Sequence, residues 1–306
     1  MKKYDLSALS ETLSSRHGCV CTFDEPMSRH TTFRIGGPAE LFVELGNEDS
    51  LRDALIWCYE NEVPCFVLGN GSNLLVSDRG IKGVVLHIGA GLSKIEQISD
   101  TVIECSAGVR LSTLCTYALE RSLSGLEFAY GIPGNCGGAA YMNAGAYGGE
   151  MKDVLISCNH LTRSGEKGSL SSDDLGLGYR TSAYASNGYI ITSLRLQLAR
   201  GDREAINEKM KELLSRRKDK QPLDLPNAGS VFKRPEGYFA GALIEQAGLK
   251  GFSVGGACVS EKHAGFIVNK GSATCDDVLK LIDEIQKKVL DMFGVTLECE
   301  IKRVGE

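Results

Sequence analysis

Two glycine-rich segments are the parts of this sequence best suited to bind a ligand through the backbone. The segment Gly131–Ala140 reads Gly-Ile-Pro-Gly-Asn-Cys-Gly-Gly-Ala-Ala, and mostly small residues continue to Gly149. A second run, Gly-Asn-Gly-Ser-Asn, occupies 69–73 directly after the apolar stretch Cys65–Leu68. Glycine is favoured where φ is positive or where the backbone approaches a ligand closely, and successive main-chain N–H groups can form an anion-binding concavity. The segments therefore predict loops, neither helix nor strand, that hold two parts of one extended cofactor.

The upstream loop does not carry a complete dinucleotide-binding fingerprint. Gly69 and Gly71 match the first glycines of Gly-x-Gly-x-x-Gly, but Leu74 stands where the third is required, which excludes a Rossmann-type site. A tight turn is the alternative for this loop, because Ser72 and Asn73 are common turn residues. No P-loop occurs, so its chemistry is not expected. The histidines lack ligand-like spacing, so no metal site is expected; they are His17, His30, His87, His160 and His263.

Three polar side chains are candidates for chemistry, although local sequence favours a plainer interpretation for each. Arg180 follows a Gly-Leu-Gly-Tyr turn and is either a surface residue or a fork-shaped donor to a carboxylate or enolate. Ser230 follows a glycine and reads as a turn residue. Glu300 shares the polar face of an alternating segment with Glu298 and Lys302, which is typical of a solvated edge strand.

Composition narrows the class of protein. The chain has 306 residues and a net charge of −5, which argues against nucleic-acid binding, since such affinity comes mainly from neutralised phosphates. We expect neither a signal peptide nor a membrane-spanning segment from the residues of this sequence. The eleven cysteines include no Cys-x-x-Cys pair, which indicates reduced thiols in the cytoplasm. Cys136 is interpreted as a small filler within the glycine segment rather than as a reactive thiol.

The first two-thirds of the chain alternate short strands with a few helices. Apolar runs predict strands at 41–45, 65–68, 84–88 and 101–105, and β structure returns between 156 and 198. A helix capped by Ser50 is predicted from the shared face of Leu51, Ala54, Leu55 and Cys58, and another over 111–121. The first thirty residues carry no recognisable chemistry.

The remaining residues have a different pattern. A charged helix over 202–220 reads as a boundary element, and an apolar helix over 239–247 ends at Gly248. Thr274 begins a long helix with a capping box completed by Asp277, and Gly294 ends it. Its buried stripe is Val278, Leu281, Ile282, Ile285 and Val289, and alternation predicts a last strand over 295–302. We expect an α+β protein with cofactor-side subdomains at 1–95 and 96–200, followed by a smaller domain at 201–306.

Taken in order, these segments resemble the UDP-N-acetylenolpyruvoylglucosamine reductase family across nearly the whole chain. The short segment between Arg180 and Lys220 resembles the compact form of the family, which lacks an extra substrate-covering loop. Arg234 departs from the pattern, because some members carry asparagine there, and its charge could instead meet phosphate. The motifs that carry the resemblance are Thr32–Gly37, the Gly-Asn-Gly-Ser-Asn loop, Gly-Ile-Pro-Gly with Asn143–Gly148, Tyr179-Arg180, Asn227–Ser230, Leu243–Gly248 and the closing Leu-x-x-Glu at Leu297 and Glu300.

The resemblance implies a fold and a reaction. The fold is a two-part FAD-binding domain of the vanillyl-alcohol-oxidase (PCMH) type, over about 33–199, with a smaller α+β substrate-binding domain after it. The reaction is a ping-pong cycle in which NADPH reduces FAD and leaves, and the flavin then reduces UDP-N-acetylglucosamine enolpyruvate to UDP-N-acetylmuramate. That chemistry belongs to cytoplasmic peptidoglycan precursor synthesis, and through the cell wall to cell shape and division.

The resemblance also assigns residues. Ser230 is the implied proton donor, Arg180 suits the developing enolate oxygen, and Glu300 supports the same carboxylate if it is protonated or hydrogen-bonded. The implied cofactor-binding residues are Gly69, Asn70, Gly71, Ser72, Asn73, Leu74, Ile132, Pro133, Gly134, Gly137, Gly138, Asn143 and Gly145. The candidate substrate-binding residues are Tyr147, Tyr179, Lys220, Lys233 and His263, the two lysines for the diphosphate.

Two other functions remain open on sequence. An FAD-dependent oxidase or dehydrogenase of an alcohol or hydroxy acid would share the cofactor domain. Such enzymes often tether flavin through histidine or cysteine, and the loops offer Cys136 but no histidine. A flavin-binding sensor or storage module without turnover is the third hypothesis, and it gives Ser230, Arg180 and Glu300 no reason to converge.

Overall fold

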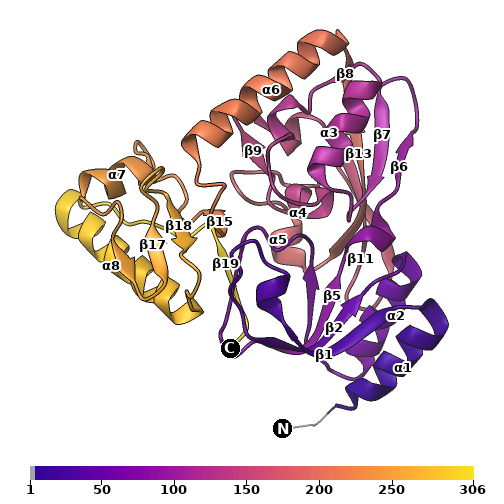
Figure 1. Ribbon diagram of the computed structural model, residues 1–306. Helices are drawn as coiled ribbons and strands as arrows, with labels where there is room; N and C mark the ends of the chain where they lie inside the picture. Colours follow the sequence, from indigo (N-terminus) through magenta and orange to yellow (C-terminus); the bar gives the residue numbers. More distant parts are fainter. Residues whose placement is uncertain (1–3) are drawn as a thin grey trace. The chain divides into compact units, whose positions relative to one another are not determined.

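A computed structural model describes residues 4–306, and they form two compact units (Figure 1). The N-terminal unit comprises residues 4–23, 41–70 and 83–216, and the C-terminal unit comprises 24–40, 71–82 and 217–306. Each unit has its own hydrophobic core. The predicted domains are contiguous in sequence, whereas the C-terminal unit takes two short segments from the first third of the chain. The predicted domain bounds, including the division at residue 95, stay a prediction.

Helices and strands alternate along most of the chain, as expected for an α+β protein. The α-helices are α1 (Leu6–His17), α2 (Glu48–Glu60), α3 (Leu111–Glu120), α4 (Cys136–Tyr141), α5 (Tyr184–Asn187), α6 (Arg203–Lys220), α7 (Ala240–Gln246) and α8 (Cys275–Phe293). The longer strands are β1 (Val20–Pro26), β2 (Pro38–Glu44), β3 (Cys65–Leu68), β5 (Ile81–His87), β7 (Val102–Ser106), β11 (Leu155–Leu161), β12 (Lys167–Ser171), β13 (Ile190–Gln197), β15 (Asn227–Ser230) and β18 (Phe266–Asn269). The shorter strands are β4 (Leu74–Val76), β6 (Ile95–Gln97), β8 (Leu123–Ser124), β9 (Gly145–Ala146), β10 (Gly149–Glu150), β14 (Ala199–Arg200), β16 (Ser253–Val254), β17 (Ala257–Val259) and β19 (Lys302–Val304). Four 3₁₀ turns are also described, at Met27–Arg29, Ala90–Leu92, Glu127–Ala129 and Met151–Asp153.

Antiparallel pairing builds the main sheet of the N-terminal unit. Its strand order is β12-β11-β13-β7-β6, and every neighbouring pair is antiparallel. A second sheet has the order β1-β2-β5-β3, in which β3 and β5 run parallel. The end of β3 at Leu68 leads directly into the upstream glycine loop. The second sheet thus fixes the point from which the upstream glycine loop starts.

The C-terminal unit packs helices against a small antiparallel sheet with the order β15-β18-β17-β16. The predicted helix α8 is confirmed in detail: the Thr274 side chain accepts from the Asp277 N–H, and Gly294 adopts φ +67° at the C-cap. All five predicted stripe residues are buried in the unit's core. In Figure 1, α8 and α7 flank the strands β17 and β18 of this unit.

The start of α2 corrects the prediction that Ser50 is the cap. Asn47 is the N-cap, and its side-chain oxygen accepts the Ser50 N–H at 2.8 Å. The Ser50 hydroxyl in turn accepts the Asn47 N–H at 3.1 Å, which completes a capping box. The prediction chose the wrong member of a reciprocal pair. The buried face of Leu51, Ala54, Leu55 and Cys58 is confirmed.

Helix α1 adds an element to the N-terminal segment in which no chemistry was recognised. The Asp5 side chain accepts from the Ser7 N–H at 3.1 Å, and Gly18 ends the helix with φ +65°. Leu6, Leu9 and Leu13 are buried in the N-terminal core, and α1 packs beside α2 (Figure 1). Apolar residues three and four positions apart are a helical signal, so the sequence did contain the information.

The predicted strand over 295–302 is wrong. Only Lys302–Val304 forms a strand, β19, which pairs in parallel with β4. Before it, a single bridge joins Cys299 to Phe232. Leu297 and Ile301 are buried, whereas Cys299 between them is exposed. Strict alternation would bury all three, so the chain must bend here to follow the core.

Within residues 4–306, no helix is both long and apolar enough to cross a membrane.

Candidate active site

The downstream glycine segment contains a short helix, which corrects the prediction of a loop without helix. Helix α4 occupies Cys136–Tyr141, after Asn135 at its N-cap. The Cys136 N–H donates to Val109 O at 2.8 Å, and the Asn135 side chain donates to Ile88 O at 3.0 Å. Glycine disfavours a helix on its own, but these tertiary bonds fix the first turn.

Adjacent glycines of α4 have different roles. The Gly137 N–H donates to Ala107 O at 2.9 Å, and a Cβ on Gly137 would lie 2.7 Å from Ala107 Cβ. A close contact within the protein therefore requires glycine at 137. Gly138 has no such neighbour: a Cβ there would meet no atom within 4 Å, and its φ is not in the left-handed region.

Gly69 of the upstream loop resembles Gly138 in this respect. The nearest atoms to a Cβ on Gly69 belong to Asn135 at 3.8 Å, which is ordinary contact. Gly71, by contrast, has φ +60° and would place a Cβ 2.1 Å from His30 O. Gly69 and Gly138 thus leave room that the protein itself does not need. That is the space expected beside a close-lying ligand.

The other predicted cofactor residues of these loops lie in ordinary surroundings. Gly134 O accepts from the Leu111 N–H at 3.0 Å, and Ile132 packs against the N-terminal core. Pro133 is exposed, whereas Asn70 and Ser72 are half-buried and Leu74 is the first residue of β4.

Asn143 is a buried connection point between two loops. Its side-chain nitrogen donates to Glu150 Oε2 at 2.6 Å and to Gly178 O at 2.9 Å. Its side-chain oxygen accepts from the Lys152 N–H at 2.9 Å. The residue is 0% exposed, and φ is +42°, a conformation that asparagine tolerates better than most residues. Asn143, predicted to bind the cofactor, therefore first of all fixes the loop that carries Gly145.

Arg180 is held beside this loop. Its Nη2 donates to Gly145 O at 3.2 Å, and its guanidinium lies 5.2 Å from the centroid of the Tyr179 ring. The backbone of Arg180 has φ +55°, which costs a non-glycine residue roughly 1 kcal/mol or more. Such strain in a polar loop is a marker of a functional position. The exposed Tyr147, on the turn between β9 and β10, lies 5.0 Å from the Arg216 guanidinium.

In the C-terminal unit, the chain brings Glu300 and Asn73 next to the Ser230 strand. The Glu300 N–H donates to Val231 O at 2.7 Å, directly after Ser230. Asn73 Nδ2 donates to Glu300 O at 3.4 Å, and Asn73 O accepts from the Lys302 N–H at 2.9 Å. Three segments far apart in sequence therefore meet at this point. Asn73, predicted as a cofactor residue, also supports Glu300.

The Ser230 hydroxyl donates to Phe232 O at 3.2 Å. A methyl group on Gly265 would lie 3.6 Å from Ser230 Oγ and 3.0 Å from His263 Cε1, so Ser230 and His263 flank the same glycine. His263 Nδ1 accepts from the Gly265 N–H at 3.1 Å, and burial lowers the pKa of His263. The histidine therefore acts as a neutral acceptor beside the serine.

The predicted diphosphate lysines lie on the surface. Lys233 Nζ is 3.0 Å from Glu298 Oε2, with side-chain exposures of 38% and 72%. Lys220 is the exposed last residue of α6. Arg234 donates to Tyr238 O at 3.4 Å, and its guanidinium lies 4.0 Å from the Phe239 ring centroid.

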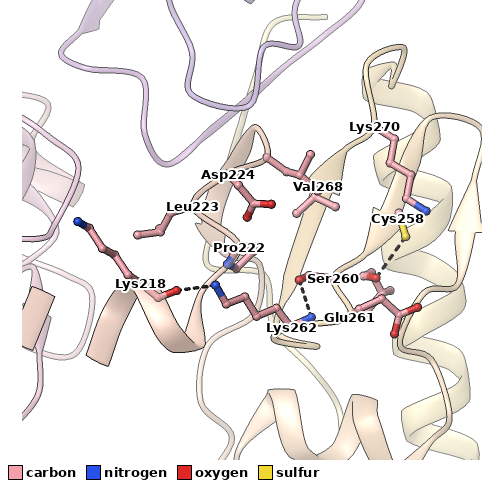
Figure 2. A pocket seen from close by; sticks show the side chains of 12 residues that line it. Lys218, Pro222, Leu223, Asp224, Cys258, Ser260, Glu261, Lys262, Val268 and Lys270 are labelled. Carbon is pink, nitrogen blue, oxygen red and sulfur yellow. Dashed lines mark hydrogen bonds between the residues drawn. The ribbon is translucent and has the colours of Figure 1, made fainter. Parts of the chain in front are cut away.

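A pocket of about 540 Å³ also lies in the C-terminal unit (Figure 2). Lys218, Lys262 and Lys270 line it, and the Lys262 ammonium donates to Lys218 O. Among the described residues that line it, none is a predicted site residue. Asp224 and Glu261 line it as well, and sequence reasoning missed this pocket because its charged residues come from separate segments.

Cys136 is completely buried within α4. A hydrogen bond with Cys105, together with burial, raises the pKa of the Cys136 thiol well above its ordinary value. This supports the interpretation of Cys136 as a filler rather than a reactive thiol.

Comparison with known proteins connects both halves of the chain to one family. Residues 39–170 match the FAD binding domain family, and residues 221–304 match the C-terminal domain of UDP-N-acetylenolpyruvoylglucosamine reductase. UDP-N-acetylenolpyruvoylglucosamine reductase of Agathobacter rectalis is 52% identical over 296 residues, covering 92% of this chain and 93% of that protein. The chain belongs to the UDP-N-acetylenolpyruvoylglucosamine reductase family. The resemblance inferred from the motifs is therefore confirmed.

Further relatives in the reductase family agree. The Alkaliphilus oremlandii reductase is 52% identical over 283 residues, covering 92% of this chain and 93% of that protein. The crystal structure of the Thermus caldophilus reductase (MurB) matches with a TM-score of 0.79 and 35% identity, covering 94% of this chain and 98% of that one. The predicted fold class, an FAD-binding domain followed by a reductase C-terminal domain, is confirmed. Both glycine segments lie within the FAD-binding match, Ser230 and Glu300 lie within the C-terminal match, and Arg180 lies between the two.

Proposed function

We propose that this protein is an FAD-dependent reductase of peptidoglycan precursor synthesis that uses NADPH to convert UDP-N-acetylglucosamine enolpyruvate to UDP-N-acetylmuramate. The observation that carries the proposal is the presence, in one chain, of an FAD-binding domain and the C-terminal domain of this reductase family. A flavin oxidase would share only the first of these. The eleven free cysteines and a nucleotide-linked substrate support a cytoplasmic location, from which the enzyme contributes to cell shape and division.

The two glycine loops are proposed to hold FAD. When bound, FAD supplies the hydride, which originates from NADPH. Gly69 and Gly138 are proposed to leave space for the cofactor, and the resemblance to the family assigns the remaining predicted cofactor residues to it. Support for this assignment comes from glycines that the protein's own packing and backbone conformation do not explain.

Arg180 is proposed to bind the carboxylate of the enolpyruvyl group. Addition of hydride to the vinyl carbon pushes negative charge onto that carboxylate as an enolate, so a fixed positive group lowers the barrier where charge develops. An arginine is always charged and can bind both oxygens at once. The bond from Arg180 to Gly145 O and the strained backbone support a fixed orientation.

Ser230 is proposed to give the proton that completes the reduction at the adjacent carbon. A serine hydroxyl is a weak acid, so it can serve only against a strongly basic carbanion or with a relay. Glu300, whose backbone pairs with Val231, is proposed to support the enolate in a protonated or hydrogen-bonded form, because a bare carboxylate would repel it. Tyr147, Tyr179, Lys220, Lys233 and His263 are proposed to contact the sugar nucleotide, with the lysines on its diphosphate.

Product analysis tests the function. Purified protein loaded with FAD is incubated with NADPH and UDP-N-acetylglucosamine enolpyruvate without oxygen. We expect equimolar NADPH oxidation and a sugar nucleotide that has gained two hydrogens. NADPH oxidation that requires oxygen and leaves the sugar nucleotide unchanged would contradict the proposal and favour the oxidase hypothesis.

A further inference from the structure

Two cysteines meet where helix α2 ends and strand β3 begins. Cys58 lies in the last turns of α2 and is 2% exposed, whereas Cys65 is the half-buried first residue of β3. Cys65 packs against the core cluster that contains Cys58, and each thiol shifts the pKa of the other. Two thiols in contact can be joined by a disulfide with little movement of the chain.

An arginine is fixed against one of the two sulfurs. Arg163 Nη1 donates to Cys65 Sγ at 3.2 Å and to Cys65 O at 3.1 Å. Its Nε donates to Gly188 O at 3.0 Å, which holds the guanidinium in this orientation. A cation beside a cysteine favours the thiolate, which is the nucleophilic form.

The pKa values of the two thiols are shifted in opposite directions. The interaction with Cys58 and the charge of Arg163 lower the pKa of Cys65 against the opposing effect of burial. The same interaction, together with burial, raises the pKa of Cys58. One member of the pair is therefore poised as a thiolate and the other as a thiol.

We propose that Cys65 and Cys58 are a peroxide-sensitive modification site, in which Cys65 is oxidised first and Cys58 resolves it to a reversible disulfide. The proposal rests on the contact between the thiols and on the arginine that donates a hydrogen bond to the Cys65 sulfur. It is independent of the reductase function and concerns residues to which that function assigns no role.

The chemistry balances with a hydroperoxide as the oxidant. The Cys65 thiolate attacks one peroxide oxygen, so that an S–O bond forms, the O–O bond breaks and the leaving hydroxide takes a proton to become water. Cys65 is oxidised to the sulfenic acid. The Cys58 sulfur then attacks the Cys65 sulfur, an S–S bond forms, the S–O bond breaks and the thiol proton leaves with hydroxide as a second water.

Other thiols of this chain provide internal references. Cys115 and Cys158 are buried, and burial raises the pKa of each. Cys299 is exposed, but partial burial of its sulfur and the charge of Asp283 raise its pKa. Exposure alone would make Cys299 the most reactive of these thiols. The local chemistry instead makes Cys65 react before Cys299.

The test uses full-length protein loaded with FAD and treated with limiting hydrogen peroxide, followed by alkylation and peptide mass spectrometry. We expect a Cys58–Cys65 disulfide to form before Cys299 is oxidised and to disappear on treatment with dithiothreitol. In Cys58→Ser, a dimedone adduct should accumulate on Cys65. In Cys65→Ser, Cys58 should stay reduced. Oxidation of Cys299 first, or oxidation of Cys58 without Cys65, would overturn the proposal.

The role of the arginine has its own measurement. Arg163→Met should slow oxidation of Cys65 about tenfold when the rate is measured near about pH 5, below the Cys65 pKa of about 6, because a rise of one pKa unit lowers the thiolate fraction by that factor at such a pH. Arg195→Met is the control, because Arg195 is also a surface arginine on the sheet but pairs with Glu104. An unchanged rate in a folded Arg163→Met protein, as judged by circular dichroism, would remove Arg163 from the site.

Discussion

The glycine segment of the N-terminal unit and the Ser230 strand of the C-terminal unit hold their polar groups in opposite ways. In the glycine segment, the Gly137 N–H and the whole side chain of Asn143 are engaged by the protein itself. Ser230 donates to Phe232 O at 3.2 Å, beyond the usual O–H···O range of about 2.5–3.0 Å. In the glycine segment, the polar groups are bonded within the protein, and what remains for a ligand is mainly the space beside Gly138. In the Ser230 strand, the serine hydroxyl makes only a long hydrogen bond, so it can exchange Phe232 O for another partner with little loss of free energy.

The largest effect is expected from Ser230→Ala. Loss of a general acid typically slows a step by about 10²–10⁴-fold, so reoxidation of the flavin by the enolpyruvyl substrate should slow by that order while reduction by NADPH keeps its rate. Anaerobic stopped-flow absorbance separates the two half-reactions. Ser253→Ala is the control, since Ser253 also donates to a carbonyl two residues away, Gly251 O, on an exposed strand. A normal reoxidation rate in Ser230→Ala would exclude Ser230 as the proton donor.

Arg180→Lys should lower turnover by at least about tenfold while FAD stays bound, because lysine keeps the charge but loses the planar two-pronged geometry. Steady-state NADPH oxidation and the flavin-to-protein absorbance ratio give the two readouts. Arg200→Lys, at an exposed site near Asp100, is the matched control. Full turnover in Arg180→Lys would reduce Arg180 to a scaffold residue.

Substitutions at the adjacent glycines, Gly137 and Gly138, test whether protein stability and FAD binding depend on different positions of the glycine segment. Gly137→Ala should destabilise the protein by about 1–3 kcal/mol, because its Cβ would collide with Ala107. Gly138→Ala should not destabilise the flavin-free protein, because alanine favours a helix over glycine by about 0.5–1 kcal/mol, but it should weaken FAD binding. Urea unfolding and FAD titration measure the two quantities. If Gly138→Ala bound FAD normally, the space beside Gly138 would not belong to the cofactor.

The substrate-side cations are expected to have a smaller effect. Lys233→Ala should raise the KM for the sugar nucleotide roughly tenfold with little change in kcat, as expected for loss of one charge-assisted contact. Lys262→Ala, in the pocket of the C-terminal unit, should leave KM unchanged. The reverse result would assign the diphosphate to the pocket rather than to Lys233.

The smallest effect concerns pH. Burial lowers the pKa of His263 below its unfolded value near 6.5, so the unfolded chain binds more protons and stability rises with pH. Stability contributed by neutral His263 should therefore be complete above about pH 7 and decline as pH falls through about 6.5. Burial also lowers the pKa of His160, so the contribution of His160 to stability declines with falling pH in the same direction. His160 therefore accounts for the variation of stability with pH that remains when His263 is replaced. The urea midpoint of His263→Gln should vary less between about pH 7.5 and 5.5 than that of the wild type; an equal variation would contradict the assignment.

Local patterns predicted some elements fully and others not at all. The cap, the buried stripe and the end of α8 could all be predicted from the sequence, because each depends on residues in or next to the helix itself. The bend over 295–301 was not, because it depends on the bridge from Cys299 to Phe232 and on the pairing of β19 with β4. Such partners lie far away in sequence, and alternation alone does not reveal them.

The site shows the same division. Glycine density indicated both candidate cofactor loops, and the motif order identified the family. The sequence could not tell that Gly137 serves packing and Gly138 does not, because the deciding neighbour, Ala107, lies on a different segment. Nor could it reveal that Asn73 supports Glu300, since that contact depends on the pairing of two strands from opposite ends of the chain.

The most direct test of the central claim is the visible spectrum of the FAD-loaded protein under anaerobic conditions. The account predicts that NADPH bleaches the flavin absorbance and that UDP-N-acetylglucosamine enolpyruvate, added next, restores it without oxygen. Flavin that is bleached by NADPH but stays reduced until oxygen enters, or a protein that binds no FAD on reconstitution, would contradict it.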